Sequence, residues 1–175
     1  MADVAELLAE QGVRYAVIGA MAAAAHGVVR ASLDADAVVA LQVHEARVLR
    51  KSLIEAGYQA QLTVGDVDDA IPALLEVRDC HGNRVDLLIG LRGMDPEALS
   101  RTRQVSFAGA TLEIAGREDF VAMKAFAGEP VDLADARAVM DLDRGSLDMD
   151  LLRRLAPRFG RETVTAVEVL VGAAG

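Results

Sequence analysis

Three aspartates of this 175-residue chain have the residue type and spacing of a divalent-metal site: Asp34, Asp36 and Asp86. Asp34 and Asp36 open the segment DADAVVAL, which is typical of a buried strand. Side chains alternate across a strand, so both carboxylates are expected on one face, about 7 Å apart. Asp86 interrupts the apolar run VDLLIGL, where a charged carboxylate is costly unless it is paired or metal-bound. The three residues therefore predict a site for Mg²⁺, which usually takes carboxylates together with substrate phosphates; an ion pair of Asp86 with Arg84 or Arg30 is the alternative.

A phosphate-binding turn is predicted just before the aspartate pair. Gly19 ends a short apolar run suited to a strand, and a stretch of small residues beginning at Ala20 favours a helix. Unpaired backbone N–H groups at the start of a helix attract anions, phosphate included. Gly19 and Ala20 are therefore expected to cradle phosphate. Arg30, four residues before Asp34, either contacts phosphate or pairs with a carboxylate.

A second cluster of charged residues lies in the segment MKAFAGEPVDLADARAV. The chain contains only two lysines, Lys51 and Lys124. Lys124 could contact a phosphate as a point charge. Asp132 and Asp135 lie three residues apart, which places them on the same face of an expected helix. The alternatives are a solvent-exposed lysine for Lys124 and a helix N-cap or first-turn acid for Asp132.

The elements that must position these residues alternate between strands and helices over the first half of the chain. Hydrophobic periodicity and glycine or proline breaks predict strands at residues 15–18, from Asp34, and at 58–64, 73–78, 84–91, 104–107 and 111–114. Helices are expected at 4–11, 43–56, 117–126, 131–141, 149–158 and 163–171. This order predicts an α+β fold, with a mixed β-sheet, helices packed on it and a helical C-terminal third. We expect an α/β core over residues 1–115 and a helical extension, packed on that core, over residues 116–175.

These blocks resemble the motifs of the DNA polymerase β-type nucleotidyltransferase superfamily, and within it those of the bacterial abortive-infection toxin branch. The resemblance covers roughly residues 10–140. It rests on Gly19, His26-Gly27, Arg30 and Asp34-Ala-Asp36, on Asp86 in an R-V-D-L-L-like strand, and on Lys124 followed by an Ala-Gly turn and Asp132-x-x-Asp135.

The resemblance implies the nucleotidyltransferase fold and transfer of a nucleoside monophosphate from a nucleoside triphosphate (NTP), with Mg²⁺ or Mn²⁺. It implies that Asp34, Asp36 and Asp86 are both the catalytic residues and the metal ligands, with Asp86 nearest the acceptor. It also implies a set of nucleotide-binding residues: Gly19, Ala20, Arg30, Lys124 and Asp132. An antitoxin partner is implied by the toxin branch.

Two departures from the resemblance lower the expected affinity for a triphosphate. The superfamily's turn is usually Gly-Gly or Gly-Ser, whereas this chain has Gly19-Ala20, and alanine offers no hydroxyl. Relatives in the toxin branch carry basic residues after the Ala-Gly turn, where this chain has Glu129 and Val131.

Two hypotheses about the function follow. The first is an Mg²⁺-dependent enzyme that modifies a protein, small-molecule or RNA acceptor. The second is a catalytically weakened nucleotide-binding or interaction module.

The composition of the chain limits the kinds of molecule that it is expected to bind. A net charge of −9 disfavours extended nucleic-acid binding, which normally requires a basic surface. The single cysteine, Cys80, excludes an internal disulfide and a multi-cysteine zinc site. No apolar run approaches the ~20 residues of a membrane span. Acidic residues near the N-terminus replace the lysines of a secretory signal, so we expect a cytoplasmic protein without membrane contacts.

Overall fold

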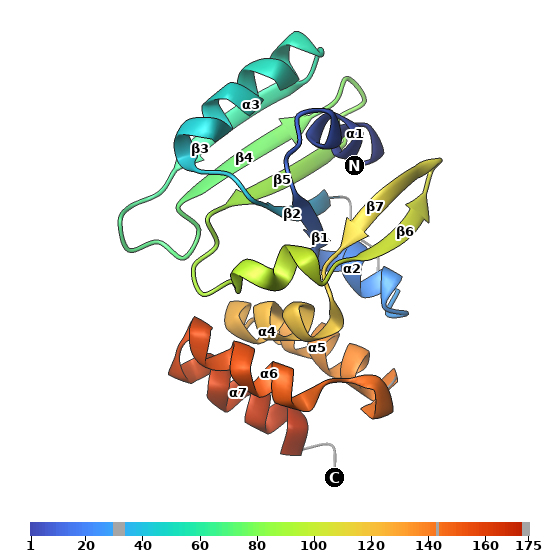
Figure 1. Ribbon diagram of the computed structural model, residues 1–175, viewed down its shortest axis with the longest axis vertical. Helices are drawn as coiled ribbons and strands as arrows, with labels where there is room; N and C mark the ends of the chain where they lie inside the picture. The colour runs from blue at the N-terminus through green and yellow to red at the C-terminus, as the bar shows by residue number, and fades with distance from the viewer. Residues whose placement is uncertain (30–33, 143, 173–175) are drawn as a thin grey trace.

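The computed structural model describes residues 1–29, 34–142 and 144–172, and Figure 1 shows its arrangement. The strands are β1 (Tyr15–Ile18), β2 (Asp34–Val39), β3 (Gln59–Val64), β4 (Ala73–Arg78), β5 (Arg84–Ile89), β6 (Arg103–Phe107) and β7 (Ala110–Ile114). The α-helices are α1 (Ala2–Glu10), α2 (Gly19–Ala25), α3 (Val43–Glu55), α4 (Arg117–Ala127), α5 (Pro130–Leu142), α6 (Met149–Leu155) and α7 (Arg161–Gly172). Short 3₁₀ helices are η1 (Pro96–Ser100), η2 (Arg144–Ser146) and η3 (Ala156–Phe159).

The strands form one seven-stranded mixed sheet in the order β3-β4-β5-β2-β1-β7-β6. β2 pairs with β5 in parallel, and β1 pairs with β7 in parallel, whereas the other neighbours are antiparallel. The predicted mixed sheet is confirmed. The parallel β2–β5 pair matters most, because it brings two segments that are fifty residues apart in the sequence side by side at the site.

The two faces of the sheet differ in polarity because residues alternate along each strand. On β2, β4 and β5, one set of alternating side chains is apolar and fully buried, with Ala37, Leu75 and Leu87 at its centre. This face packs with Leu49 of α3 and with α1 in the main hydrophobic core. The opposite face of the same strands carries charged residues, and the candidate site lies there.

Helices α4 to α7 lie together beyond one end of the sheet, whereas α3 lies at the other end (Figure 1). A second apolar cluster, which includes Ala16, Val38 and Met123, joins the charged face of the sheet to α4. The main core also contains residues from both segments, such as Ile114 and Leu152. The division at residues 115 and 116 stays a prediction about folding units.

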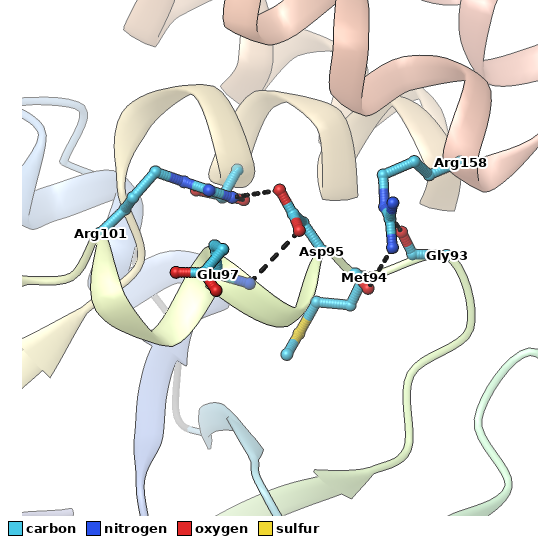
Figure 2. Close-up of polar contacts among 7 residues, drawn as sticks. Gly93, Met94, Asp95, Glu97, Arg101 and Arg158 are labelled. Atoms are coloured by element: carbon cyan, nitrogen blue, oxygen red, sulfur yellow. Dashed lines mark hydrogen bonds and ion pairs between the residues drawn. The ribbon is translucent and has the colours of Figure 1, made fainter.

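The connection between β5 and β6 ties the C-terminal helices to the sheet by polar contacts. In Figure 2, Arg101 reaches Asp95, and Arg158 reaches the backbone carbonyls of Gly93 and Met94. Arg101 also donates two hydrogen bonds, of 2.8 and 2.7 Å, to the buried carboxylate of Asp119 near the start of α4. These contacts fix the N-terminal half of α4 against the sheet. None of the helices in the described ranges has the length and apolar content needed to cross a lipid bilayer.

Candidate functional site

The turn after β1 brings Gly19 into direct contact with Asp36. Ile18 lies opposite Asp36 in the antiparallel β1–β2 pair, so the following residue passes over the Asp36 side chain. Gly19 has φ +63°, a left-handed conformation that glycine adopts without strain. A Cβ atom at this position would lie 2.2 Å from Asp36 Oδ2. Backbone conformation and lack of space therefore both require glycine here.

Asp36 and Asp86 lie on neighbouring strands at the same level of the sheet. The parallel register of β2 and β5 places Asp86 directly opposite Asp36, and Arg84 opposite Asp34. Burial raises the pKa of Asp36, and the negative charges of Asp86 and Asp34 raise it further, against the opposing charge of Lys124. The predicted juxtaposition of Asp86 with the Asp34–Asp36 strand is thus present, and the repulsion expected of clustered carboxylates acts on Asp36.

Arg84 holds the Asp86 carboxylate with two hydrogen bonds, which Nε donates at 2.8 Å and Nη2 at 2.6 Å. The same guanidinium lies 3.2 Å from Glu76 on β4, so it bridges two carboxylates across the sheet. The pairing of Asp86 with Arg84, one alternative of the sequence analysis, is therefore observed. In the parts of the chain that the structure describes, no three histidine, cysteine or acidic side chains are arranged to hold a metal ion. Metal binding by Asp86 would require Arg84 to move.

Replacing Arg84 by glutamine should strengthen metal binding by releasing Asp86. A hydrogen bond to a charged group contributes about 1.5–3 kcal/mol, so we expect about tenfold higher Mn²⁺ affinity in Arg84→Gln. The variant should be less stable than wild type without metal and should regain stability as Mn²⁺ is added. Calorimetric titration with Mn²⁺ measures the change. Arg78→Gln is the matched control, because Arg78 pairs with Glu76 rather than with Asp86. Equal Mn²⁺ affinity in all three proteins would contradict this account.

Lys124 is buried in the structure, with 8% of its surface exposed. Its Nζ atom lies 2.5 Å from Asp132 Oδ1 and 3.1 Å from Asp135 Oδ2, and 5.7 Å from the centre of the Phe120 ring. The alternative of a solvent-exposed lysine is wrong. The shared face of Asp132 and Asp135 is confirmed, because both carboxylates reach the same ammonium group. The positive charge of the buried ammonium group is therefore offset by the two carboxylates that contact it.

One cleft of about 430 Å³ joins the turn after β1 to this lysine cluster. Four predicted residues line it: Gly19, Asp36, Lys124 and Asp132. Most of the wall is apolar and comes from the end of β1, from β5 and the residues after it, from the loop before β4, and from α4: Ile18, Ala70, Ile71, Leu88, Leu91, Phe120, Met123, Phe126 and Ala127. The cleft has the size and the mixed lining of a small-molecule site.

The apolar wall was missed by the sequence reasoning. Leu88 belongs to the expected strand, yet its side chain follows Asp86 on the charged face rather than packing in the main core. Ile71 lies shortly after three acidic residues, Asp66, Asp68 and Asp69, which favour a solvent-exposed loop. No signal in the sequence distinguishes these residues from ordinary core residues.

The remaining predicted residues do not line this cleft. Asp34 and Ala20 line a separate hollow together with Arg84, and the Ala20 side chain is buried. Asp86 lies beside Asp36 but is covered by Arg84. Arg30 lies outside the described residues.

The raised pKa of Asp36 predicts that Asp36→Asn stabilises the metal-free protein at neutral pH. An acid whose pKa is raised by folding contributes stability to the folded state that is fully present only below its ordinary pKa of about 3.9. As pH rises through the pKa of folded Asp36, that contribution is lost, because burial and Asp86 oppose ionisation. Asp36→Asn should therefore have the higher Tm at pH 7, and this advantage should shrink as pH falls toward 3.9.

Asp132→Asn is the matched control for this measurement, because Asp132 is paired with Lys124. The asparagine amide would weaken the attraction to Lys124 instead of removing a repulsion, so the Tm of Asp132→Asn should fall at pH 7. Thermal unfolding across pH 3–7 in metal-free buffer compares the variants. A lower Tm for Asp36→Asn than for wild type at pH 7 would show that Asp36 is stabilised as a charged group.

Several solved structures resemble the chain over most of its length. An antigenic nucleotidyltransferase-like protein from Paracoccidioides brasiliensis matches with a TM-score of 0.58 and 16% identity, over 98% of this chain and 85% of that one. The antibiotic-resistance factor ANT(2″)-Ia, solved with adenylyl-2″-tobramycin, gives 0.56 and 16% identity over 89% and 92% of the two chains. The lincosamide antibiotic adenylyltransferase LnuA, solved with lincomycin, gives 0.51 and 11% identity over 78% and 92%.

Comparison of the sequence with protein families and with curated proteins gives no match. The structural likeness therefore rests on shape at low sequence identity, and it establishes the fold. The chain has the nucleotidyltransferase fold that the sequence motifs predicted.

Proposed function

We propose that this chain is a metal-dependent nucleotidyltransferase that moves a nucleoside monophosphate from an NTP to an acceptor. The observation that carries the proposal is the contact between Gly19 and Asp36, with Asp86 beside Asp36 and the Lys124 cluster in the same cleft. The left-handed turn at Gly19 lies directly against the half-buried carboxylate of Asp36, whose pKa is raised by burial. Such an arrangement has no evident structural benefit, whereas it suits a phosphate and a bound cation placed side by side.

The carboxylates fit a divalent metal ion in chemical type, because Mg²⁺ and Mn²⁺ prefer oxygen ligands. Asp34 and Asp36 would hold the ion together with phosphate oxygens of the substrate, and Asp86 would join them once Arg84 releases it. When bound, the ion would neutralise charge on the phosphates and assist the attacking oxygen. A bound ion would also offset the burial and the carboxylate repulsion that raise the pKa of Asp36.

The chain's own residues would orient the reactants in this proposal. Backbone N–H groups at Gly19 and Ala20 would donate to phosphate oxygens. Lys124 would stay in its pair with Asp132 at the cleft wall, and its charge would be offset by the two carboxylates that it contacts. The apolar wall around Leu88 and Met123 would exclude water from one side of the bound molecule. Asp86, next to Asp36, would accept the proton of the acceptor hydroxyl.

Small-molecule alcohols come first among the acceptors to be tested. Two of the similar structures are antibiotic adenylyltransferases, and the described cleft is of small-molecule size. The net charge of −9 argues against an extended nucleic acid as acceptor. A protein acceptor and a short RNA end are the other classes named by the sequence analysis.

A nucleotide-binding or interaction module without turnover is the second candidate. Three observations favour it: Ala20 offers no hydroxyl to phosphate, Asp86 is already paired with Arg84, and Lys124 is already neutralised by two carboxylates. Each of them reduces the affinity for a triphosphate. The proposed enzyme would therefore need the metal ion to offset the negative charge of the cleft.

The proposal includes a role as the toxin of a toxin–antitoxin pair. This role rests on the sequence motifs of Lys124, Asp132 and Asp135. Expression from a tightly controlled promoter tests it. Growth arrest by the wild-type chain, lost in Asp36→Asn, would support a toxin. Normal growth at equal protein levels would contradict it.

Transfer of label from α-labelled NTPs tests the proposed activity. The protein is incubated with Mg²⁺, each of the four NTPs and a lysate, after which protein, RNA and small-molecule fractions are counted separately. We expect label in one fraction with wild type and none with Asp36→Asn. Binding of NTP without transfer, in the presence of Mg²⁺ or Mn²⁺, would favour the module.

A further inference from the structure

Strand β3 forms one edge of the sheet, and its outer side has no partner strand in the part of the chain that the structure describes. β3 is the last strand in the sheet order and pairs only with β4. Just after β3, Gly65 donates its N–H to the carbonyl of Pro72 at 2.9 Å, so every second residue before Gly65 also faces β4. The backbone groups that point away from β4 therefore belong to Ala60, Leu62 and Val64. They form a row to which another strand could add.

β3 lacks the features that usually protect an edge strand from pairing. Natural edge strands carry charged residues, proline or a β-bulge. The segment Gln59–Val64 contains no charged residue and no proline, and all of its residues stay in register with β4. The strand at the opposite edge, β6, begins with Arg103. β3 is therefore suited to strand addition, in which an extended peptide pairs with the edge of a sheet.

A groove of about 780 Å³ follows this edge, where α3 passes over the end of the sheet (Figure 1). None of the residues that line it lines the cleft of the proposed nucleotide site. The lining comes from α3, β3 and β4: Arg47, Arg50, Gln59, Ala60, Gln61, Leu62, Val64, Glu76 and Arg78. Arg47 and Arg50 come from α3, which packs on the face of the main core. Glu76 and Arg78 lie on the opposite face of β4 and pair with each other at 2.9 Å.

The α3 side of the groove is positively charged in a chain whose net charge is −9. Arg50 Nε donates to the Ala60 carbonyl at 3.0 Å, which places the guanidinium at the outer edge of β3. Arg47 lies three residues earlier, on the same side of α3, and both arginines are exposed. Neither forms an ion pair with any residue in the described ranges. Their Nη groups are therefore available to carboxylates.

We propose that the β3 edge binds an extended acidic segment of a partner protein by strand addition. The backbone of the segment would pair with Ala60, Leu62 and Val64. Side chains opposite these three residues would project on the α3 side, because directly opposed residues share a face of the sheet. Carboxylates at these alternate positions would meet Arg47 and Arg50. The intervening side chains would lie on the opposite face, whose charges are already paired, so no acid is required there.

The position of α3 favours such a segment over a second copy of this chain. Two β3 strands paired edge to edge would lie about 4.8 Å apart. Each would bring its own α3 on the same face of the joined sheet, because Leu49 and Leu53 pack with Ala60 and Leu62 in the main core. Packed helices need about 8–10 Å between their axes. The two sets of arginines would also repel each other, whereas an acidic segment without a helix avoids both problems.

Titration with a designed peptide tests the site. The probe, acetyl-Thr-Glu-Val-Glu-Val-Glu-Thr-amide, alternates acids with uncharged residues. The full chain is titrated at pH 7 and constant ionic strength, and NMR follows the backbone amide shifts and the exchange of amide hydrogens. We expect saturable shifts in residues 59–64 and slower exchange at Leu62 and Val64, whose N–H groups point away from β4. Exchange at Gln61 and Thr63 should change little, because these N–H groups already pair with β4.

A matched peptide and two sets of variants test the role of charge. The same probe with glutamine in place of glutamate should bind about tenfold more weakly, because hydrogen bonds to charged groups are lost. Arg47→Gln combined with Arg50→Gln should remove this preference for the acidic peptide. Lys51→Gln is the control on the same helix and should keep it, because Lys51 pairs with Glu55 at 3.6 Å and does not line the groove.

Val64→Pro tests the backbone pairing. Val64 is 52% exposed, and its N–H points away from β4, so proline removes an outward donor and leaves the pairing with β4 in place. Binding should fall at least about fivefold with the lost hydrogen bond and the blocked edge. Val64→Thr keeps the N–H and should bind like wild type.

Three results would each overturn the proposal: shifts that do not saturate, equal affinity for the glutamate and glutamine peptides, or unchanged binding in Val64→Pro. Slow exchange at Leu62 in the free chain that becomes slower with protein concentration would also overturn it, because it would identify a second copy as the occupant. The readout is binding without NTP or metal, so the result is independent of whether the chain transfers nucleotides.

Discussion

Gly19→Ala is expected to lower the free energy of unfolding by about 2–5 kcal/mol and to abolish nucleotide transfer. The left-handed backbone at φ +63° costs about 1–2 kcal/mol with any side chain that has a Cβ. The added Cβ would also lie 2.2 Å from Asp36 Oδ2, so the carboxylate or the turn must move. Either movement separates the backbone N–H groups from the carboxylate on which the proposed chemistry depends. Chemical denaturation measures the first effect and label transfer the second.

Gly12→Ala separates the two contributions. Gly12 has nearly the same backbone angle, φ +67°, and nothing lies within 4 Å of the Cβ that a substitution would add. It should therefore show only the conformational cost. Shortening Asp36 to alanine in the Gly19→Ala background should restore part of the lost stability, because the clash is removed, but no activity. Equal destabilisation by Gly12→Ala and Gly19→Ala would show that the contact with Asp36 is unimportant.

Lys124→Met is expected to destabilise the protein by about 3–5 kcal/mol, because it removes the buried ammonium group that both carboxylates contact. Asp132 and Asp135 both contact the ammonium group, and Asp135 is buried. Methionine fills a similar volume, so the loss of charge pairing dominates the effect. If Lys124 also contacts phosphate, nucleotide binding in the presence of Mn²⁺ should weaken in conditions where the variant remains folded. Denaturation curves and calorimetric titration measure these two effects.

Two further variants serve as controls for the effect of Lys124→Met. Replacing both Asp132 and Asp135 by asparagine in the Lys124→Met background should recover much of the stability, because the repulsion between the two carboxylates is removed. Lys51→Met, at an exposed lysine paired with Glu55, should change stability by less than about 0.5 kcal/mol. A loss below about 1 kcal/mol in Lys124→Met would contradict the importance of the buried cluster.

Local patterns predicted the fold because each local signal agreed with the tertiary structure. The apolar runs around Asp86 and before Gly19 predicted the strands, and the Asp-x-x-Asp spacing placed Asp132 and Asp135 together on α5. Glycine and proline breaks gave the ends of most helices within a few residues. These signals depend only on neighbours in the sequence, so they can be interpreted without knowledge of the fold.

The contacts between distant segments could not be predicted in this way. The partner of Lys124 depends on how α5 folds back onto α4, and the sequence equally allowed an exposed lysine. Asp86 pairs with Arg84 in the structure, whereas the sequence also allowed a metal ion beside it. The pairing depends on the register of β4 and β5, which places Glu76 on the other side of the Arg84 guanidinium. Likewise, Leu88 and Met123 line the cleft only because α4 lies across the charged face of the sheet.

Anomalous diffraction from crystals grown with Mn²⁺ and non-hydrolysable analogues of the four NTPs, each in turn, tests the central claim most directly. The account predicts a Mn²⁺ peak within about 2.5 Å of oxygens of Asp34 and Asp36. With one of the analogues, it predicts phosphates beside the Gly19 turn and Arg84 turned away from Asp86. Fully occupied crystals with all four analogues, in which no Mn²⁺ lies at Asp36 and Arg84 still holds Asp86, would contradict it.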